Sequence, residues 1–289
     1  MEKVNPHKIL ILGSAGMLGH MVYRTFSEIE GYELFDLSLS MPLNSNTIIF
    51  DVQDTVGLEK IIYKIKPNYI INCIGMLIRK SNKDKEKAIF INAYFPHYLQ
   101  RLSEQIDFKL IHISTDCVFD GKKGVYSENS LTDAQDLYGK TKALGEFNNQ
   151  KHLCIRTSII GPELKENGEG LLHWLFNQKG KIFGYKGVFW GGVTTLELSR
   201  AIHFSIENKI TGLWNLTNGK PISKFSLLDK IINTFSIRQI SLVTNSKKVS
   251  DKSLTSNRGI NYKVPSYDQM LIELKVNFEQ NKSIYNYQI

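Results

Sequence analysis

The sequence predicts a doubly wound α/β fold, in which helices cover both faces of a parallel sheet. Two observations carry the prediction: short apolar runs alternate with longer amphipathic runs through the first half of the chain, and a glycine-rich turn follows the first apolar run. Strands buried on both faces are apolar throughout rather than alternating. After about residue 157 this rhythm changes, so we expect a second, smaller lobe toward the C-terminus.

The elements follow from periodicity and composition. The apolar runs predict strands at 8–12, 32–37, 47–50, 69–73, 109–114, 153–156 and 212–216. Apolar residues at three- and four-residue spacing predict helices at 17–30, 56–65, 85–105, 135–149, 171–178, 194–206, 223–235 and 266–278. The segment 184–192 mixes glycine with aromatic residues, which predicts a binding loop rather than a strand.

The composition limits which classes of protein the chain can belong to. The 289 residues are 42% hydrophobic and 22% charged, which is enough apolar sequence for a large core. The net charge of +8 comes from lysines interleaved with acids, so we expect solvated helix faces and no nucleic-acid partner. No apolar run reaches the roughly 18 residues that cross a bilayer, and the N-terminal run is too short for a signal peptide.

The three cysteines, Cys73, Cys117 and Cys154, lie far apart in the sequence. An odd, scattered set favours neither a disulfide framework nor a CxxC metal site. We therefore expect a cytoplasmic protein.

The glycine-rich turn reads Gly13-Ser-Ala-Gly16-Met-Leu-Gly19, between a predicted strand and a predicted helix. Backbone N–H groups and the helix dipole can hold a phosphate there, and glycine lets the backbone approach it closely. This context predicts a dinucleotide site rather than an ordinary tight turn. Two later strands end in Asp51-Val52 and in Asn72-Cys-Ile-Gly75, at the edge where doubly wound sheets bind ligands.

A second motif, Tyr138-Gly-Lys-Thr-Lys142, lies on a predicted helix. The four-residue spacing places the phenol and the ammonium on one helix face. A nearby ammonium stabilises a phenolate, which makes the phenol a better proton donor to a carbonyl that is being reduced. By itself YxxxK is common, and a surface pair is the simpler interpretation.

The end of the fifth strand favours a catalytic Tyr138–Lys142 pair over a surface pair, because it reads Ser114-Thr115-Asp116-Cys117. A hydroxyl there can orient a substrate carbonyl beside Tyr138. We favour Thr115 for this role, although either hydroxyl could cap the loop instead.

Together GSAGMLG, STDCVFDG, YGKTK and the later Arg156-Thr-Ser resemble the dTDP-4-dehydrorhamnose reductases of the extended short-chain dehydrogenase/reductase group. The resemblance implies a Rossmann-type fold and hydride transfer from NADPH or NADH to the 4-keto group of a nucleotide-linked 6-deoxyhexose, which feeds surface polysaccharide synthesis. It places Thr115, Tyr138 and Lys142 on the catalytic positions. The cofactor site is then expected at Gly13, Ser14, Gly16, Met17, Leu18, Gly19, Asp51, Val52, Cys73, Ile74, Gly75, Asn92, Tyr138 and Lys142.

The substrate is expected at Thr115, Asp116, Cys117, Trp190 and Gly191. Trp190 could stack on a base or sugar, or it could pack between lobes.

We expect residues 1–160 with about 193–217 to form the cofactor domain, and 161–192 with 218–289 to form the substrate-binding lobe. The chain could be a homodimer.

The chain also departs from the family pattern. Cys117 stands where the family usually has tyrosine, so the exact sugar stays open. The family's metal-binding glutamate is replaced by His20 and its neighbours, which predicts no structural metal. An acid at the end of strand two is typical of NAD binding, yet Asp36 falls a residue or two before that end, and both cofactors stay open. The histidines lack metal-ligand spacing and are expected at the surface or satisfied in the core.

Two other functional interpretations of the sequence stay open. An epimerase or dehydratase of nucleotide sugars would share the glycine turn and YxxxK. A non-catalytic regulatory subunit could keep the same fold, because a fold does not fix a function.

Overall fold

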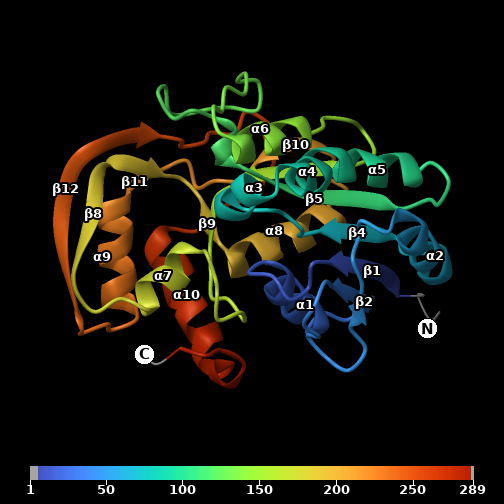
Figure 1. Cartoon of the computed structure of the whole chain (residues 1–289), viewed down its shortest axis with the longest axis horizontal. Coiled ribbons are helices and arrows are strands. Elements are labelled where there is room, and N and C mark those ends of the chain that lie inside the picture. Colours follow the sequence, from blue (N-terminus) through green and yellow to red (C-terminus); the bar gives the residue numbers. More distant parts are fainter. Residues whose placement is uncertain (1–5, 288–289) are drawn as a thin grey trace. The chain divides into compact units, whose positions relative to one another are not determined.

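The computed structural model describes residues 6–287 (Figure 1). The chain divides into two compact units. The first consists of Met1–Ser114, Asp136–Ile155 and Ser199–Leu213, and the second of Thr115–Gln135, Arg156–Leu198 and Trp214–Ile289. Residues 115–135, which the sequence division placed in the cofactor domain, belong to the second unit.

A seven-stranded sheet carries the doubly wound topology that the sequence predicts. Its strand order is β10-β6-β5-β4-β1-β2-β3, and the pairs β1–β2, β1–β4, β2–β3 and β4–β5 are parallel. The order reverses between β1 and β4, so ligands are expected beyond the carboxyl ends of these two strands. The strands are β1 (His7–Leu12), β2 (Tyr32–Ser38), β3 (Ile48–Ile49), β4 (Tyr69–Asn72), β5 (Lys109–Thr115), β6 (Leu153–Thr157) and β10 (Gly212–Asn215).

Helices flank this sheet because its strands are apolar on both faces. Leu10 and Leu12 of β1 pack in one core cluster with Leu58 of α2 (Thr55–Ile65) and Leu99 of α5 (Phe95–Leu102). Alternation along the strand turns Ile9 and Ile11 to the other face. The remaining helices of the first unit are α1 (Gly19–Ser27), α3 (Ile78–Lys83), α4 (Lys85–Ile89) and α6 (Leu137–Leu144), and α8 (Thr195–Glu207) belongs to the first unit from Ser199 onward.

The predicted helix at 85–105 is not one regular helix. It consists of α4, a π-helical segment Phe90–Tyr94, and α5. Pro96 lies in the first turn of α5, directly after the π-helical segment, so its ring removes one N–H from a helix that is otherwise continuous. A π-helical segment is rare and often marks a functional position.

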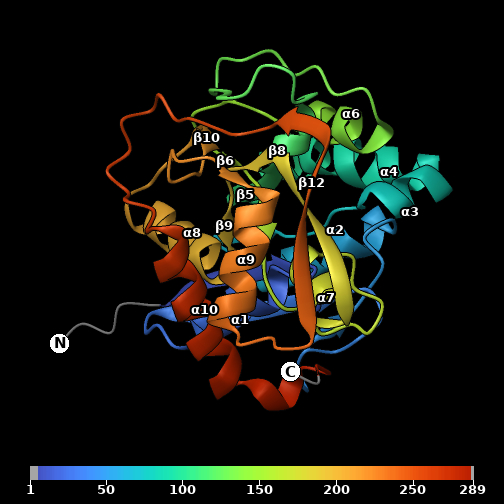
Figure 2. The same cartoon turned by 90° about the vertical axis from the view of Figure 1, so that its left-hand side faces the viewer.

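The second unit is built around a three-stranded sheet of order β11-β8-β12. Its strands are β8 (Gly180–Trp190), β11 (Ile222–Ser223) and β12 (Ile240–Asp251), and α9 (Lys224–Thr234) packs against β8 and β12 (Figure 2). Helix α10 (Tyr267–Gln280) packs on α9. Helix α7 (Leu171–Phe176) and the short pair β7 (Ile159–Ile160) and β9 (Val193–Thr194) complete this unit.

The expectation of a loop at 184–192 was wrong, because most of this segment is the second half of β8. Its glycines serve close packing rather than a loop: a Cβ on Gly184 would lie 2.8 Å from the Cα of Phe225 in α9. Strand β12 was missed altogether, because its polar residues do not form an apolar run.

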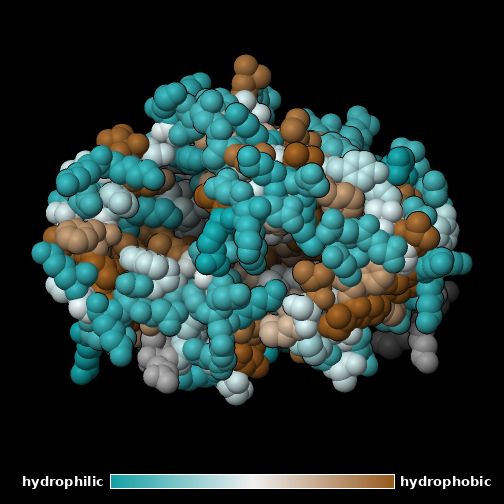
Figure 3. Space-filling view, viewed as in Figure 1, coloured by the Kyte–Doolittle hydropathy of each residue, from teal (hydrophilic) through white to brown (hydrophobic). Residues whose placement is uncertain are grey.

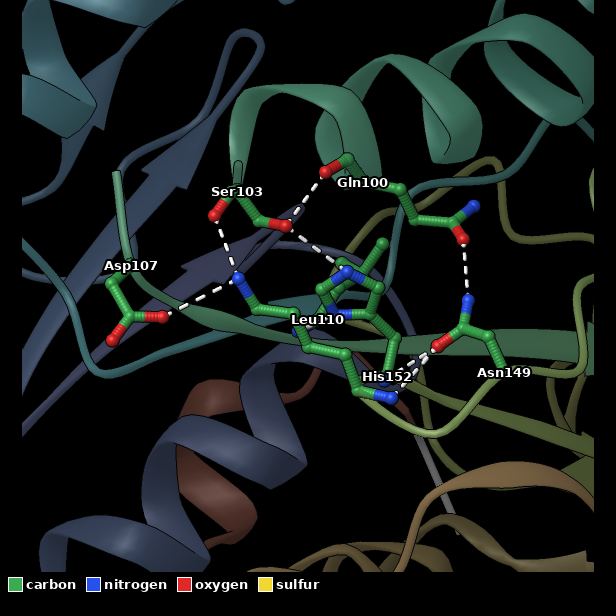
Figure 4. A network of polar contacts seen from close by, with 7 residues as sticks. Gln100, Ser103, Asp107, Leu110, Asn149 and His152 are labelled. Atoms are coloured by element: carbon green, nitrogen blue, oxygen red, sulfur yellow. Dashed lines mark hydrogen bonds and ion pairs between the residues drawn. The ribbon is translucent and has the colours of Figure 1, made fainter. Parts of the chain in front are cut away.

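At the amino edge of the large sheet, where β5 and β6 begin, a polar network joins α5 to the two strands (Figure 4). Nδ1 of His152 accepts from the N–H of Leu110 at 3.0 Å, and its Nε2 lies 3.0 Å from Oγ of Ser103. Asn149 accepts from the N–H of His152 and donates to Gln100. The network therefore fixes the start of β6 against the end of α5.

Hydrophilic side chains are spread over the face seen in Figure 3, and hydrophobic ones form separate groups. Within residues 6–287, each helix is either too short or too polar to cross a membrane.

Candidate functional site

The glycine-rich turn connects β1 to α1 at the carboxyl edge of the first unit. Gly13 has a φ of +83°, and its N–H donates to the carbonyl of Leu37 at the end of β2. The N–H of Gly16 donates back to the carbonyl of Gly13 at 3.0 Å. A side chain at Gly19 could not fit, because a Cβ there would lie 2.1 Å from that same carbonyl oxygen.

This turn has the features that a phosphate needs. Leu18 at the N-cap of α1 forms no side-chain cap, so it offers no acceptor to the first N–H groups of the helix. His20 closes the turn instead, with Nδ1 2.8 Å from the carbonyl of Gly16. Burial lowers the pKa of His20 to about 4. Ser14 is buried and Met17 half-buried.

The loop after β4 lies beside this turn in the first unit. Gly75 is exposed, and a Cβ there would meet only Oδ1 of Asn92 at 3.8 Å. A Cβ on Gly13 would lie 2.9 Å from Ile74. Burial raises the pKa of the Cys73 thiol to about 12, so this thiol stays protonated.

Asn92 lies in the π-helical segment and holds the same loop in place. Its side chain accepts from the N–H of Met76 at 2.9 Å and donates to the carbonyl of Met76 at 3.0 Å. It also donates to Oγ1 of Thr141 on α6 at 3.2 Å. Asn92 therefore links the loop after β4 to the helix that carries Tyr138.

The acids near this edge differ in their surroundings. Asp51 is exposed and pairs with Lys87 at 3.4 Å, while Val52 is buried in the core cluster. Asp36 lies inside β2, and its Oδ1 accepts from Asn44 at 3.1 Å. Its Oδ2 is buried without a hydrogen-bond partner.

Tyr138 and Lys142 are both on α6, one turn apart, and both are buried. Asp136 caps this helix by accepting from the N–H of Gly139 at 2.9 Å. The helix packs closely on the π-helical segment, because a Cβ on Gly145 would lie 2.0 Å from the carbonyl of Asn92.

The ammonium of Lys142 is held against β5. Nζ donates to the carbonyl of Ile113 at 2.7 Å and lies 3.2 Å from Nε2 of His112. Burial lowers the pKa of Lys142 to about 8, although Cys154 and Glu146 act in the opposite direction. Lys142 is thus a buried amine that can change its charge near neutral pH.

The two hydroxyls at the end of β5 have different partners. Ser114 in the first unit donates to Oε1 of Glu146 at 2.5 Å. Thr115 in the second unit donates to Oδ1 of Asp116 at 3.1 Å and accepts from the N–H of Cys117 at 3.1 Å. Thr115 therefore caps the 3-10 turn Asp116–Val118.

Asp116 is a buried acid of the second unit that faces two lysines. Burial raises its pKa, and the charges of Lys224 and Lys252 oppose that shift. The sheet explains the arrangement, since Ser223 of β11 and Asp251 of β12 both pair with Phe189 of β8. The lysine that follows each of them is brought to the end of β8. Burial also raises the pKa of Cys117, to about 12.

Trp190 ends β8 and is only 2% exposed. The ammonium of Lys224 lies 5.6 Å from its ring centroid, and Tyr267 donates to its carbonyl at 3.4 Å. Gly191 packs beside Ser253, where a Cβ would lie 3.4 Å from that residue's Cα. These contacts all lie within the second unit.

Sequence reasoning placed Asn72 at the ligand-binding edge without giving it a role, and it missed His112 and Lys224. The available signal for His112 was a histidine inside an otherwise apolar strand, whose side chain must find polar partners if it is buried. No sequence signal marks Lys224, which reaches Trp190 through strand pairing. Within residues 6–287, no three His, Cys, Asp or Glu side chains gather in a group that could hold a metal ion.

Comparison with known proteins identifies one matching family, described as the RmlD substrate binding domain, over residues 7–258. A solved structure, the dTDP-4-dehydrorhamnose reductase of Bacillus anthracis in complex with NADP, superposes with a TM-score of 0.80. It is 19% identical and covers 94% of this chain and 99% of its own, so the likeness shows the fold.

Two curated relatives differ in their described roles. The methionine adenosyltransferase 2 subunit beta of Xenopus laevis is 28% identical over 183 residues, which cover 61% of this chain and 53% of the relative. The dTDP-4-dehydrorhamnose reductase of Aggregatibacter actinomycetemcomitans is 28% identical over 167 residues, which cover 55% of this chain and 54% of the relative. The chain thus spans about half the length of the curated relatives it matches.

Proposed function

Because the chain belongs to the RmlD substrate binding domain family, we propose that it is an NAD(P)H-dependent reductase of a nucleotide-linked keto sugar. The proposed reaction reduces the 4-keto group of a 6-deoxyhexose carried on a nucleoside diphosphate. The observation that carries the proposal is the buried Tyr138–Lys142 pair on α6, in the same unit as the glycine-rich turn. General acid chemistry beside a dinucleotide site is what carbonyl reduction requires.

The residues at the carboxyl edge fit a nicotinamide dinucleotide. Gly13, Gly16 and Gly19 form a cradle that side chains would fill, and the uncapped start of α1 favours a diphosphate. Gly75 leaves open space beside Asn92 for the rest of the cofactor. When bound, the cofactor supplies the hydride.

The protein supplies the proton and the orientation. Tyr138 donates its phenolic proton to the carbonyl oxygen of the sugar as that oxygen gains charge. The ammonium of Lys142 stabilises the phenolate that remains. We assign Thr115, with Asp116 and Cys117, to the sugar, and Trp190 and Gly191 to the same substrate.

The choice between NADH and NADPH depends on Asp36. Its Oδ2 is a buried acceptor without a hydrogen-bond partner, within the strand whose end usually meets the adenosine ribose. A carboxylate accepts from ribose hydroxyls and repels a 2′-phosphate, so Asp36 favours NADH. Both cofactors belong in the first assay, because Asp36 lies within β2 rather than beyond its end.

The test compares Tyr138→Phe with Tyr63→Phe, a matched change at an exposed tyrosine of α2. Loss of the proton donor should lower turnover by about 100-fold or more, while binding of the reduced cofactor, followed by its fluorescence, is kept. Tyr63→Phe should behave like the wild type. Equal turnover of wild type and Tyr138→Phe would reject the proposed role of Tyr138.

A second candidate function is that of a regulatory subunit, which is favoured by the relatives described as a methionine adenosyltransferase subunit. A subunit of that kind would co-purify with a partner enzyme and would turn over no keto sugar. The Tyr138–Lys142 pair weighs against it, because a purely structural subunit does not need a buried amine.

We propose a cytoplasmic setting, since Cys73, Cys117 and Cys154 are free thiols. A homodimer stays a prediction, which light scattering of the purified chain would test.

A further inference from the structure

His112 is a buried histidine in the centre of β5, between two polar side chains. Its Nε2 lies 3.2 Å from Nζ of Lys142, and its Nδ1 lies 3.1 Å from Nδ2 of Asn72. Asn72 is the residue beside His112 in the parallel pairing of β4 with β5, so the contact follows from strand register. All three side chains are almost fully buried.

The orientation of the Asn72 amide decides where the imidazole carries its proton. Oδ1 of Asn72 accepts from the N–H of Ile74 at 3.1 Å. A rotated amide would turn its NH₂ toward that N–H and leave two donors facing each other. Nδ2 therefore points at His112 and donates to Nδ1.

A neutral imidazole that accepts at Nδ1 carries its proton on Nε2. That N–H points toward Nζ of Lys142. An ammonium has three donors and no acceptor, whereas a neutral amine has one lone pair that can accept. The arrangement therefore favours the amine form of Lys142 over the ammonium.

We propose that Asn72 and His112 are positioning residues that set the charge of Lys142, by holding the imidazole as a hydrogen-bond donor to the lysine amine. The catalytic meaning of this inference rests on the proposed function. The hydrogen-bond arrangement itself does not, and it can be measured without any substrate.

The surroundings of Lys142 agree with this inference. Burial is the main cause that lowers its pKa to about 8, while Glu146 and Cys154 favour the charged form. Tyr138 lies one turn before it on α6. His112 cannot compete for the proton, because burial and the charges of Lys142 and His97 hold its pKa well below the usual value.

The consequence for a reductase is a charge that changes within the working pH range. Below about pH 8 Lys142 is mainly an ammonium and supports the phenolate of Tyr138. Above that pH the amine form, stabilised by His112, withdraws this support. Turnover should therefore fall on the alkaline side as Lys142 loses its proton.

Two other buried histidines of the same unit provide internal references. His152 accepts at Nδ1 from the backbone N–H of Leu110, so its proton is on Nε2. Nδ1 of His20 faces the carbonyl of Gly16 at 2.8 Å, so its proton is on Nδ1. The first has the tautomer that we assign to His112, and the second has the opposite one.

The first experiment is nitrogen NMR of the full chain labelled with ¹⁵N-histidine, recorded above the Lys142 midpoint of about 8 so that the amine form prevails, in which ring shifts report the protonated nitrogen. His112 should match the pattern of His152 and differ from that of His20. A pattern like that of His20, or that of a charged imidazole, would overturn the inference. Loss of single signals in His112→Gln, His152→Gln and His20→Gln assigns the spectrum.

A second variant reverses the arrangement. Asn72→Asp keeps an oxygen for the N–H of Ile74 and replaces the NH₂ by an acceptor. His112 should then carry its proton on Nδ1 and accept from Lys142 at Nε2, which raises the pKa of Lys142. Each pKa unit changes the ratio of charged to neutral lysine about tenfold at a given pH.

Titration of ¹³Cε-labelled lysine checks this shift, with Asn149→Asp as the matched change at the other histidine. Asn72→Asp should move the Lys142 midpoint upward and the alkaline limb of kcat with it, whereas Asn149→Asp should move neither. An unchanged midpoint or an unchanged His112 tautomer in Asn72→Asp would contradict the inference. A shifted midpoint together with a relocated His112 proton would leave the inference standing even if the wild-type chain turned over no keto sugar, a result that would reject only the proposed function.

Discussion

The two edges of the large sheet hold buried histidines that resemble each other in all but their partners. His152 at the amino edge and His112 toward the carboxyl edge are both nearly inaccessible, and the ring of Phe147 lies 6.1 Å from one and 6.2 Å from the other. Burial lowers the pKa of both imidazoles. His152, however, bonds to a backbone N–H and faces a hydroxyl, whereas His112 faces a lysine.

The difference teaches that burial alone does not mark a functional residue. The partners of the His152 ring, a hydroxyl and a backbone N–H, carry no charge, and their contacts hold α5 and the start of β6 together (Figure 4). The partner of His112 can lose a proton near pH 8. A group that changes charge within the working range is what acid–base chemistry requires.

The largest effect should come from Lys142 toward the carboxyl edge, and Lys151 at the amino edge is its matched control. Lys142→Met should lower turnover by about 100-fold or more, because the phenolate of Tyr138 loses its cation. Lys151→Met, at the amino edge, should leave turnover unchanged. Turnover of Lys142→Met close to that of the wild type would remove the contrast between the edges.

A smaller effect, on folding alone, should follow from His152→Ala. The change leaves the N–H of Leu110 without its acceptor in a buried place. An unsatisfied buried donor costs about 1–3 kcal/mol, and the lost packing adds to it. Urea unfolding should show the loss, while kcat for each folded molecule stays the same. Reduced kcat in this variant would mean that the amino edge also takes part in the reaction.

A third effect is a loss of stability in acid. The pKa values of His20 and His152 are about 4 in the folded chain and near 6.5 when unfolded. Between these values the unfolded chain binds more protons, so stability falls as pH drops from about 6.5 to about 4. The slope is at most about 1.4 kcal/mol per pH unit for each histidine. Unfolding midpoints across this range should show it, and His152→Gln should flatten it.

The smallest effect belongs to the ion pair of Lys151 with Asp107 at 3.3 Å, because Asp107 is fully exposed. Solvent screens such a pair, so Asp107→Asn should leave both the unfolding midpoint and turnover unchanged. A clear shift of the midpoint would show that the amino edge depends on charge, contrary to the description above.

Much of the fold could be predicted from periodicity, because strands buried on both faces leave apolar runs such as Ile9–Leu12. The fold of the second unit was harder to predict from the sequence. Glycines at 184, 187, 191 and 192 indicated a loop, whereas Gly184 lies in β8 and allows α9 to approach. Close packing by a helix from a distant segment leaves no local signal.

The candidate site shows the same limit. The glycine-rich turn and YxxxK could be found because each motif is local. The contact of His112 with Asn72 depends on strand register between residues 40 positions apart. Its contact with Lys142 depends on the packing of α6. Local spacing does not encode either contact. Ser114 and Thr115 likewise have different partners because consecutive side chains of β5 point to opposite faces, and which elements lie there depends on the tertiary fold.

The most direct test of the reductase account is the stoichiometry of cofactor oxidation. Purified chain is mixed with freshly generated dTDP-4-keto-6-deoxyhexose and with NADH or NADPH in separate reactions, and absorbance of the reduced nicotinamide is followed while the sugar product is quantified. The account predicts that one cofactor is oxidised for each sugar reduced. Tight cofactor binding without oxidation of either form, or conversion of the sugar without net oxidation, would contradict it.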